Sequence, residues 1–267
     1  MLLAIDCGNT NTGFAVFRGE ICVGNWRTST NSRRTADEYA VWLTQLLGLE
    51  GLSMSDIEAI IIANVVPDTA FNLMTLCQRY FGIKPMIVGE ADVILGMDIN
   101  IDDPKELGAD RIVNAIGAMD QYSGPLIVID FGTATTFDVV DENGAYSGGV
   151  IAPGINLSLE ALYNAAARLP RITIVEPGLD GEDSVTESVV GKSTRAAMNS
   201  GIFWGYIGLI EGIVGRIKLE VGRPMSVIAT GGMADIFAHR TDLVDEVDHD
   251  ITYKGLVLIY RRNHPCP

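Results

Sequence analysis

Two short stretches of the sequence carry similar polar residues in the same order, and both could bind phosphate. Residues 5–17 read IDCGNTNTGFAVF, and residues 129–141 read IDFGTATTFDVVD. In each stretch an apolar run ends in an aspartate, Asp6 or Asp130, followed by a glycine and several threonine or asparagine residues. Bare glycine backbone, successive N–H groups and hydroxyl donors together form an anion-binding nest. Because an aspartate by itself repels phosphate, we interpret both aspartates as ligands of a cation.

The repeat lies at half the length of the chain. The two aspartates are 124 residues apart in a chain of 267, and the same alignment matches Gly8 to Gly132 and Thr12 to Thr136. A repeat at this spacing predicts two related lobes. Either turn alone could be an ordinary hairpin tip with polar residues. The doubling favours a site in which both turns face one polyphosphate.

Strands and helices alternate along the chain, which is typical of an α/β fold. We expect two lobes, residues 1–123 and 124–267. Thr35–Glu38 has the pattern of a capping box and predicts the start of a helix. The other expected helices cover 68–82, 108–122, 153–168, 194–221 and 253–262. After the first 29 residues, the expected strands cover 57–66, 85–88, 126–130, 137–140, 145–151 and 226–230. We expect residues 176–188 to form a mobile loop.

Five glycines share one face of the expected helix 194–221. They follow one another at alternating spacings of four and three residues: Gly201, Gly205, Gly208, Gly212 and Gly215. Glycine weakens a helix interior by about 0.5–1 kcal/mol relative to alanine, so five of them need a compensating close approach. An internal packing groove and a subunit interface both fit this pattern.

The composition argues against several classes of partner. The formal net charge is −15, from 34 acidic and 19 basic residues, which disfavours wide contact with nucleic acid or with an anionic membrane surface. No stretch reaches the length of a membrane span, and no basic leader precedes the first strand, so we expect a cytoplasmic protein. The four cysteines are scattered without metal-ligand spacing, which disfavours structural zinc and fits a reducing compartment.

The motif GKS at 191–193 ends like a P-loop, but Thr186 stands where a P-loop needs glycine. The chain also has no GxGxxG or GxSxG motif. A Walker-type ATPase, a dinucleotide-binding enzyme and a serine hydrolase are therefore disfavoured. Two weaker signals fit a nucleotide: ATGG at 229–232, and the pair Arg33–Arg34 as a phosphate clamp or a solvated pair.

GADR at 108–111 is a candidate site for an acidic substrate. The guanidinium of Arg111 could bind a carboxylate through two hydrogen bonds. The carboxylate of Asp110 could accept the proton of a substrate hydroxyl. The alternative is an acid at a helix N-terminus that interacts favourably with the helix dipole, next to a surface arginine.

Taken together, these motifs resemble the type III pantothenate kinases, once described as the Bvg accessory factor family. The likeness covers almost the whole chain. It is carried by motifs in the order of the family: DxGNTNT at 6–12, RTADEY at 34–39, GADRIVNA at 108–115, VIDFGTATTFDVV at 128–140, GGVIAPG at 148–154, LP at 169–170, GKST at 191–194, SGIFWGY at 200–206 and ATGG at 229–232.

The resemblance implies the fold and the reaction. The fold is that of the acetate and sugar kinase, heat-shock chaperone and actin superfamily: two duplicated ribonuclease H-like lobes with ATP in a cleft between them. The reaction transfers the γ-phosphate of ATP to the terminal hydroxyl of pantothenate, the first committed step of coenzyme A biosynthesis. Members are homodimers that use Mg²⁺ and a monovalent cation, K⁺ or NH₄⁺.

The resemblance also implies roles for individual residues. ATP would be bound by Asp6, Cys7, Gly8, Asn9, Thr10, Asn11, Thr12, Gly13 and Thr133. Pantothenate would be bound by Gly108, Ala109, Asp110, Arg111 and Thr194. Asp110 would accept the proton, Asp130 would bind the monovalent cation, and Asp6 would lie near Mg²⁺.

The chain departs from the family pattern at three places. Ile101 stands where many relatives have a tyrosine that touches pantothenate, Gly13 replaces a β-branched residue, and the loop 178–188 is longer than usual. These departures leave two alternatives open. One is another small-molecule kinase or polyphosphate hydrolase of the same fold; the other is a non-catalytic, nucleotide-sensing regulator.

Overall fold

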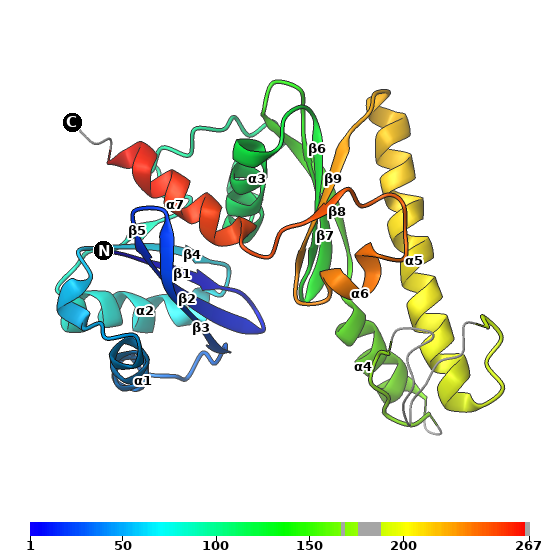
Figure 1. Cartoon of the computed structure of the whole chain (residues 1–267), viewed down its shortest axis with the longest axis horizontal. Coiled ribbons are helices and arrows are strands. Elements are labelled where there is room, and N and C mark those ends of the chain that lie inside the picture. The colour runs from blue at the N-terminus through cyan, green and yellow to red at the C-terminus, as the bar shows by residue number, and fades with distance from the viewer. Residues whose placement is uncertain (167–168, 176–187, 265–267) are drawn as a thin grey trace. The chain divides into compact units, whose positions relative to one another are not determined.

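The computed structural model describes residues 1–166, 169–175 and 188–264 of the chain. The chain forms two compact units (Figure 1). The first contains residues 1–123, 142–147 and the described residues from 250 on; the second contains 124–141 and 148–249. The expected loop 176–188 lies, apart from Ser188, outside the described residues.

Each unit contains one five-stranded mixed sheet, and the two sheets share one topology. In the first, β1 (Leu2–Cys7) pairs antiparallel with β2 (Asn11–Arg18) and parallel with β4 (Ala59–Asn64). In the second, β6 (Leu126–Phe131) has the same two relations to β7 (Ala134–Val140) and β9 (Ser226–Gly231). The strand orders are β3-β2-β1-β4-β5 and β8-β7-β6-β9-β10, with the outer strands β3 (Ile21–Ser29), β5 (Met86–Ile87), β8 (Tyr146–Pro153) and β10 (Glu246–Val247). The duplicated α/β fold predicted from the two turns is confirmed.

The alignment of the two turns with each other, made from the sequence, was wrong at one position. The turn between β1 and β2 has three residues, and the turn between β6 and β7 has two. In register, Cys7 pairs with Thr12, and Phe131 pairs with Thr135. Because the second turn is one residue shorter, Thr12 corresponds to Thr135 and not to Thr136.

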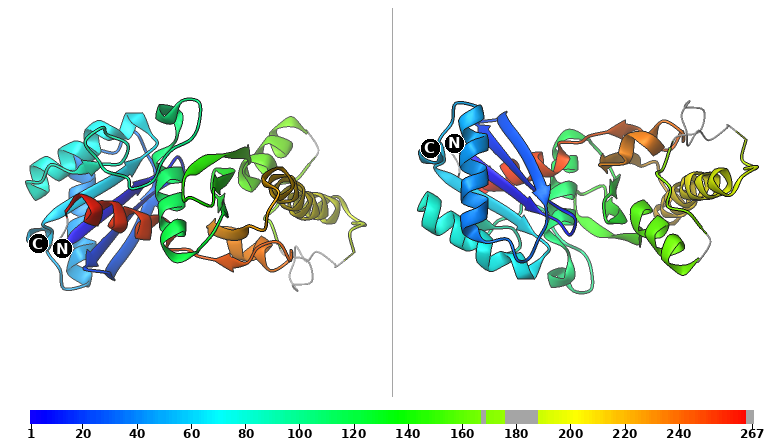
Figure 2. Two further views of the ribbon diagram at one scale, coloured as in Figure 1. Left: turned by 90° about the horizontal axis from the view of Figure 1, so that it is seen from above. Right: turned by 90° about the horizontal axis from the view of Figure 1, so that it is seen from below.

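Helices cover both faces of the first sheet (Figure 2). On one face, α1 buries Tyr39, Leu43 and Leu47 against apolar side chains of β1, β2 and β4. On the other face lie α3 and α7. The helix bounds are α1 Ala36–Leu49, α2 Ala70–Leu76, α3 Ala109–Gln121, α4 Ile155–Ala165, α5 Thr194–Val221, α6 Ala234–Ala238 and α7 Ile251–Asn263.

Helices α3 and α7 cross at two glycines. A Cβ atom added at Gly255 of α7 would overlap the Val113 carbonyl oxygen of α3, and one added at Gly117 of α3 would overlap the Ile251 carbonyl oxygen of α7. The Thr252 hydroxyl donates to the Asn114 side-chain oxygen at 2.7 Å across the same crossing. This packing places α7 in the first unit, whereas the expected boundaries placed all residues after 124 in the second lobe.

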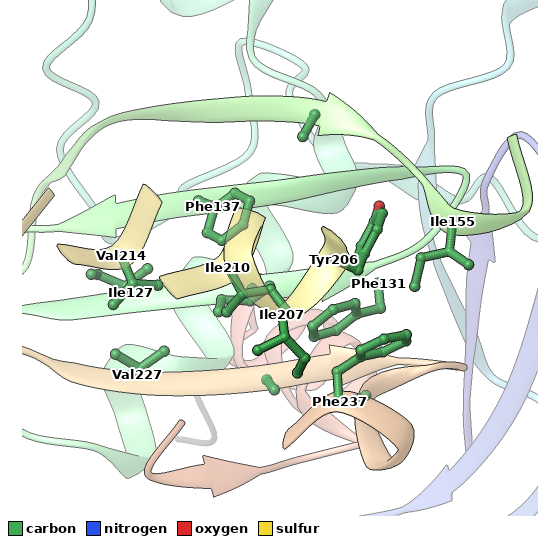
Figure 3. Packing of buried hydrophobic residues seen from close by; sticks show 14 of the residues in the cluster. Ile127, Phe131, Phe137, Ile155, Tyr206, Ile207, Ile210, Val214, Val227 and Phe237 are labelled. Atoms are coloured by element: carbon green, nitrogen blue, oxygen red, sulfur yellow. The ribbon is translucent and has the colours of Figure 1, made fainter. Parts of the chain in front are cut away.

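The core of the second unit lies between its sheet and α5 (Figure 3). Tyr206, Ile207 and Ile210 of α5 are buried against apolar side chains of the central strands, and Phe237 of α6 packs with them. The Tyr206 ring carries a polar hydroxyl, which lies 2.8 Å from the Thr135 hydroxyl and also donates to the Pro153 carbonyl oxygen. These bonds join β7 and β8 to the long helix.

Candidate active site

The first turn presents its polar side chains to solvent. The Gly8 N–H donates to the Asn11 carbonyl oxygen at 3.0 Å and closes the turn. The side chains of Asn9, Thr10 and Asn11 are exposed beyond it. Exposed amide and hydroxyl groups around a tight, glycine-containing turn are the arrangement that the phosphate-binding prediction requires.

Two of the predicted ATP-binding residues turn their side chains inward. Thr12 and Cys7 are fully buried. The Thr12 hydroxyl lies 2.9 Å from the Thr30 hydroxyl, and Thr30 donates to the Gly8 carbonyl oxygen at 2.6 Å. The Cys7 thiol lies 3.2 Å from the Thr69 hydroxyl. Cys7 and Thr12 therefore hold the turn in shape through their side chains and can reach a ligand only through their backbone.

The GADR segment forms the N-terminus of α3, with Gly108 as its cap. One carboxylate oxygen of Asp110 accepts the Arg111 N–H at 2.8 Å. A Cβ atom at position 108 would lie only 2.5 Å from that same oxygen, so glycine is needed for the carboxylate to lie over the helix end. Burial raises the pKa of Asp110, while the N–H and the positive charge of Arg111 oppose the rise. A raised pKa strengthens a carboxylate as a proton acceptor.

The Arg111 guanidinium lies over the ring of Tyr146, 5.8 Å from its centroid. Tyr146 is fully buried, and it belongs to the segment 142–147 that joins the first unit. Residue spacing gave no sign of this contact, because Tyr146 comes 35 positions after Arg111. The aromatic face holds the charged group at the start of α3.

The structure brings the first turn, residues 8–10, and the GADR segment to one edge of the first sheet. We call residues 8–10 the phosphate turn, after the ligand predicted for it. Val65 joins them: its N–H donates to the Cys7 carbonyl oxygen at 3.1 Å, and its side chain lies 3.5 Å from the position that a Cβ at Gly108 would take. Cys7 and Asn64 end the parallel strands β1 and β4. Ligands of open α/β sheets bind at the carboxyl ends of such strands.

In the second unit, Gly231 and Gly132 lie close to the carboxylate of Asp130. Gly231 has a φ of +93°, and a Cβ there would lie 2.7 Å from a carboxylate oxygen of Asp130. Gly154 likewise leaves room for the Thr133 and Gly132 carbonyl oxygens. The second turn is closed by the Gly132 N–H, which donates to the Ala134 carbonyl oxygen at 3.1 Å, and the Thr133 side chain is exposed.

The oxygen atoms at both aspartates suit hard cations. Carboxylate and carbonyl oxygens are the ligands that Mg²⁺ and alkali cations prefer. Asp130 has bare backbone beside it, and Asp6 lies half-buried at the end of β1. Within the described part of the chain, no group of three or more histidine, cysteine or acidic side chains could hold a metal ion by itself. A cation at either place would therefore need further oxygen ligands, such as phosphates.

The structure places Thr194 at the start of a helix and packs one arginine of the pair against another helix. Thr194 is the exposed first residue of α5, and the Ser193 hydroxyl before it accepts the Ala196 N–H at 3.1 Å. GKS is thus the cap of a helix, and residues 188–193 contain no strand leading into it. Arg34 lies over the Tyr39 ring, 4.9 Å from its centroid, so it packs on α1, while Arg33 is exposed.

Comparison with known proteins settles the family. The family model described as type III pantothenate kinase matches residues 2–216. The type III pantothenate kinase of Rhodospirillum rubrum is 60% identical over 265 residues, which is 99% of this chain and 100% of that protein. The chain belongs to the type III pantothenate kinase family. The family that the motifs indicated is confirmed, and so is the class of enzyme, a kinase that phosphorylates pantothenate in coenzyme A biosynthesis.

Solved structures support the fold. A Campylobacter jejuni protein described as a putative Baf family transcriptional activator is 19% identical, with a TM-score of 0.62 over 99% of this chain and 100% of that chain. The ethanolamine utilization protein EutJ of Carboxydothermus hydrogenoformans is 15% identical, with a TM-score of 0.55 over 96% and 89%. Both likenesses agree with the expected fold, an α/β chain with two five-stranded sheets of one topology.

Proposed function

We propose that this chain transfers the γ-phosphate of ATP to the terminal hydroxyl of pantothenate, with Asp110 accepting the hydroxyl proton. Arg111 binds the pantothenate carboxylate, with Gly108, Ala109 and Thr194 as further contacts. The ATP phosphates are bound by residues 6–13 and by Thr133. Phosphoryl transfer depends on in-line positioning, neutralisation of charge and a proton acceptor at the attacking hydroxyl. These residues would supply the positioning and the proton acceptor.

One observation carries the proposal: the phosphate turn and Asp110–Arg111 lie at the same edge of the first sheet. Val65 lies between them: its N–H donates to Cys7, the residue before the turn, and its side chain is 3.5 Å from where a Cβ atom at Gly108 would lie. A proton acceptor beside a polyphosphate site is what a kinase needs and a passive nucleotide sensor does not. The half-buried, ionisable carboxylate of Asp110 would be costly without such a role, since even partial burial disfavours its charged form.

Cations would complete the phosphate site. The residues that fit them are Asp6 for Mg²⁺ and Asp130 for a monovalent cation, K⁺ or NH₄⁺. When bound, these ions neutralise phosphate charge, which an acidic protein with a net charge of −15 cannot do by itself. Among the described residues, no helix has both the length and the apolar character to cross a membrane; the cytoplasmic location stays a prediction.

A coupled assay of ADP release tests the function. The purified chain should release ADP only when pantothenate is present, and release should rise at least tenfold when K⁺ or NH₄⁺ replaces Na⁺. Asp130→Asn removes the carboxylate charge that would hold the cation, so this variant should lose most of the K⁺ stimulation. Asp242→Asn, at an exposed acid of the same unit, should keep it. Binding of ATP with no turnover of pantothenate would contradict the proposal.

We also propose that the glycine stripe of α5 packs against a second copy of the chain. A Cβ atom added at Gly201, Gly205, Gly208 or Gly215 would meet no other atom within 4 Å, and at Gly212 it would meet only the Arg216 side chain. An internal packing groove therefore does not explain the stripe. Close approach of another helix does, and the homodimer expected from the family fits it.

Alanine at position 208 gives a sharp test. If the stripe faces only water, Gly208→Ala should stabilise the chain by about 0.5–1 kcal/mol, because alanine favours the helix. If two copies meet there, the added methyl group should shift the dimer toward monomer, seen by light scattering after size exclusion at low micromolar concentration. Gly48→Ala is the matched control, since Gly48 is also helical, exposed and without neighbours. A stabilised chain with unchanged mass would refute the interface.

A further inference from the structure

Tyr253 of α7 lies so close to Gly13 of β2 that a side chain at position 13 would require the Tyr253 ring to shift. A Cβ atom at Gly13 would overlap the Tyr253 hydroxyl oxygen and would lie 3.3 Å from the ring carbon that bears it. Gly13 is buried. The ring of Tyr253 is further fixed by Phe17, whose ring centroid lies 6.5 Å away. The phenol hydroxyl of Tyr253 therefore occupies the space that a side chain at position 13 would fill.

The register of the sheet shows what borders that space. Asp6 on β1 pairs with Gly13 on β2, and Gly13 pairs with Arg27 on β3. Directly paired residues point to the same face of a sheet, and neighbouring strands lie about 4.8 Å apart. An acid and a base thus flank the glycine, and the Tyr253 hydroxyl lies over the gap between them.

The electrostatics of the phenol agree with this position. Burial raises the pKa of Tyr253 most, the negative charge of Asp6 raises it further, and Arg27 opposes the rise. Cys22 and Asp250 are the other titratable groups that raise it. The phenol hydroxyl is a hydrogen-bond donor, and its electrostatic interaction with Asp6 agrees with the position that the strand register gives it.

We propose that Tyr253 is a positioning residue that orients the Asp6 carboxylate toward magnesium-bound ATP, and that Gly13 is present to admit it. The proposal rests on the proposed function. A carboxylate at the end of a strand can rotate about its Cα–Cβ and Cβ–Cγ bonds. A hydroxyl held in place on one side would restrict that rotation without adding a charge of its own.

Tyr253→Phe tests this with the ring kept in place. We expect the affinity for MgATP, measured by calorimetry without pantothenate, to fall about tenfold, and the affinity for metal-free ATP to change less than twofold. In turnover, KM for MgATP should rise while KM for pantothenate and the melting temperature stay the same. Tyr260→Phe, the same change two turns along the same helix, should alter none of these values.

A double variant separates positioning from packing. Gly13→Ala should lower the melting temperature, because the methyl group meets the hydroxyl. Gly13→Ala with Tyr253→Phe should restore the melting temperature, since only the 3.3 Å contact to the ring remains, but should keep the weakened MgATP affinity. Unchanged MgATP affinity in Tyr253→Phe, or equal losses for MgATP and free ATP, would overturn the proposal. Because calorimetry needs no acceptor, these outcomes stand even if pantothenate proves not to be phosphorylated.

Discussion

Asp110→Asn should abolish nearly all turnover while leaving the fold as stable as before. A general base contributes about 10²–10⁴-fold to rate, and we expect kcat to fall by that amount. Asparagine has nearly the same shape, and its side-chain oxygen can still accept the Arg111 N–H that Asp110 accepts at 2.8 Å. KM for MgATP should therefore stay within about twofold. Steady-state kinetics with both substrates measures these values.

The same variant should change how stability depends on pH. Burial raises the folded-state pKa of Asp110 above its unfolded value, so the folded chain holds the proton more tightly. The native chain should therefore lose stability as pH rises through the window from the ordinary aspartate pKa to the raised one, relative to the variant. Above that window, Asp110→Asn should be at least as stable as the native chain in urea unfolding.

Asp120→Asn, at an exposed acid in the last turn of the same helix, is the control for both measurements. It should keep native kcat and the native pH dependence of stability. If Asp110→Asn kept more than a tenth of native kcat, Asp110 would not be the proton acceptor. If the Asp110→Asn variant unfolded more easily than the native chain at neutral pH, the Asp110 carboxylate would stabilise the fold, and its burial would not be a cost accepted for function.

Gly255→Ala should destabilise the first unit and weaken the binding of pantothenate. The added Cβ would overlap the Val113 carbonyl oxygen and lie 2.8 Å from the carbonyl carbon, and a backbone carbonyl of a helix cannot rotate away. Overpacking of this kind costs about 1–3 kcal/mol. Because the collision pushes α3 away from α7, it should also displace Asp110 and Arg111 at the start of α3.

Calorimetric melting and the KM for pantothenate report the two effects separately. We expect a melting temperature several degrees lower and a KM raised by at least fivefold. Gly48→Ala adds the same methyl group at a helical glycine with nothing within 4 Å, and it should change neither value. A native melting temperature in Gly255→Ala would mean that the two helices can separate without cost, against the close crossing described here.

The sequence predicted the helices whose ends are marked by capping residues next to them. The helix expected over 194–221 agrees with α5, because Ser193 caps its start and Gly222, with a φ of +71°, ends it. The capping box of Thr35 and Glu38 is present as predicted. The strand β10 was missed, because two residues show no measurable periodicity. The helix α6 follows ATGG, where the strand at 226–230 was expected to lead into a helix, but its end was not predicted.

Of the candidate site, the sequence could predict residue types but not their neighbours. Asp110 and Arg111 were found because an acid and a base at a helix start fit a known chemistry. Thr30 and Tyr253 were not found, because their relation to the first turn arises from strand register and from a helix about 240 residues further along. Contacts between residues so far apart leave no pattern in a single sequence.

The discontinuous first unit constrains how the protein is made in the cell. A ribosome extends the chain by about 5–20 residues each second, and domains generally fold as their residues emerge. The helix that closes the first unit, α7, is translated only after residues 148–249, which form most of the second unit. Until then the face of α3 that contains Gly117 has no helix to pack against. The second unit can thus reach its native structure first. The first unit can complete its fold only after α7 has been translated, and until then chaperones can bind its exposed apolar surface.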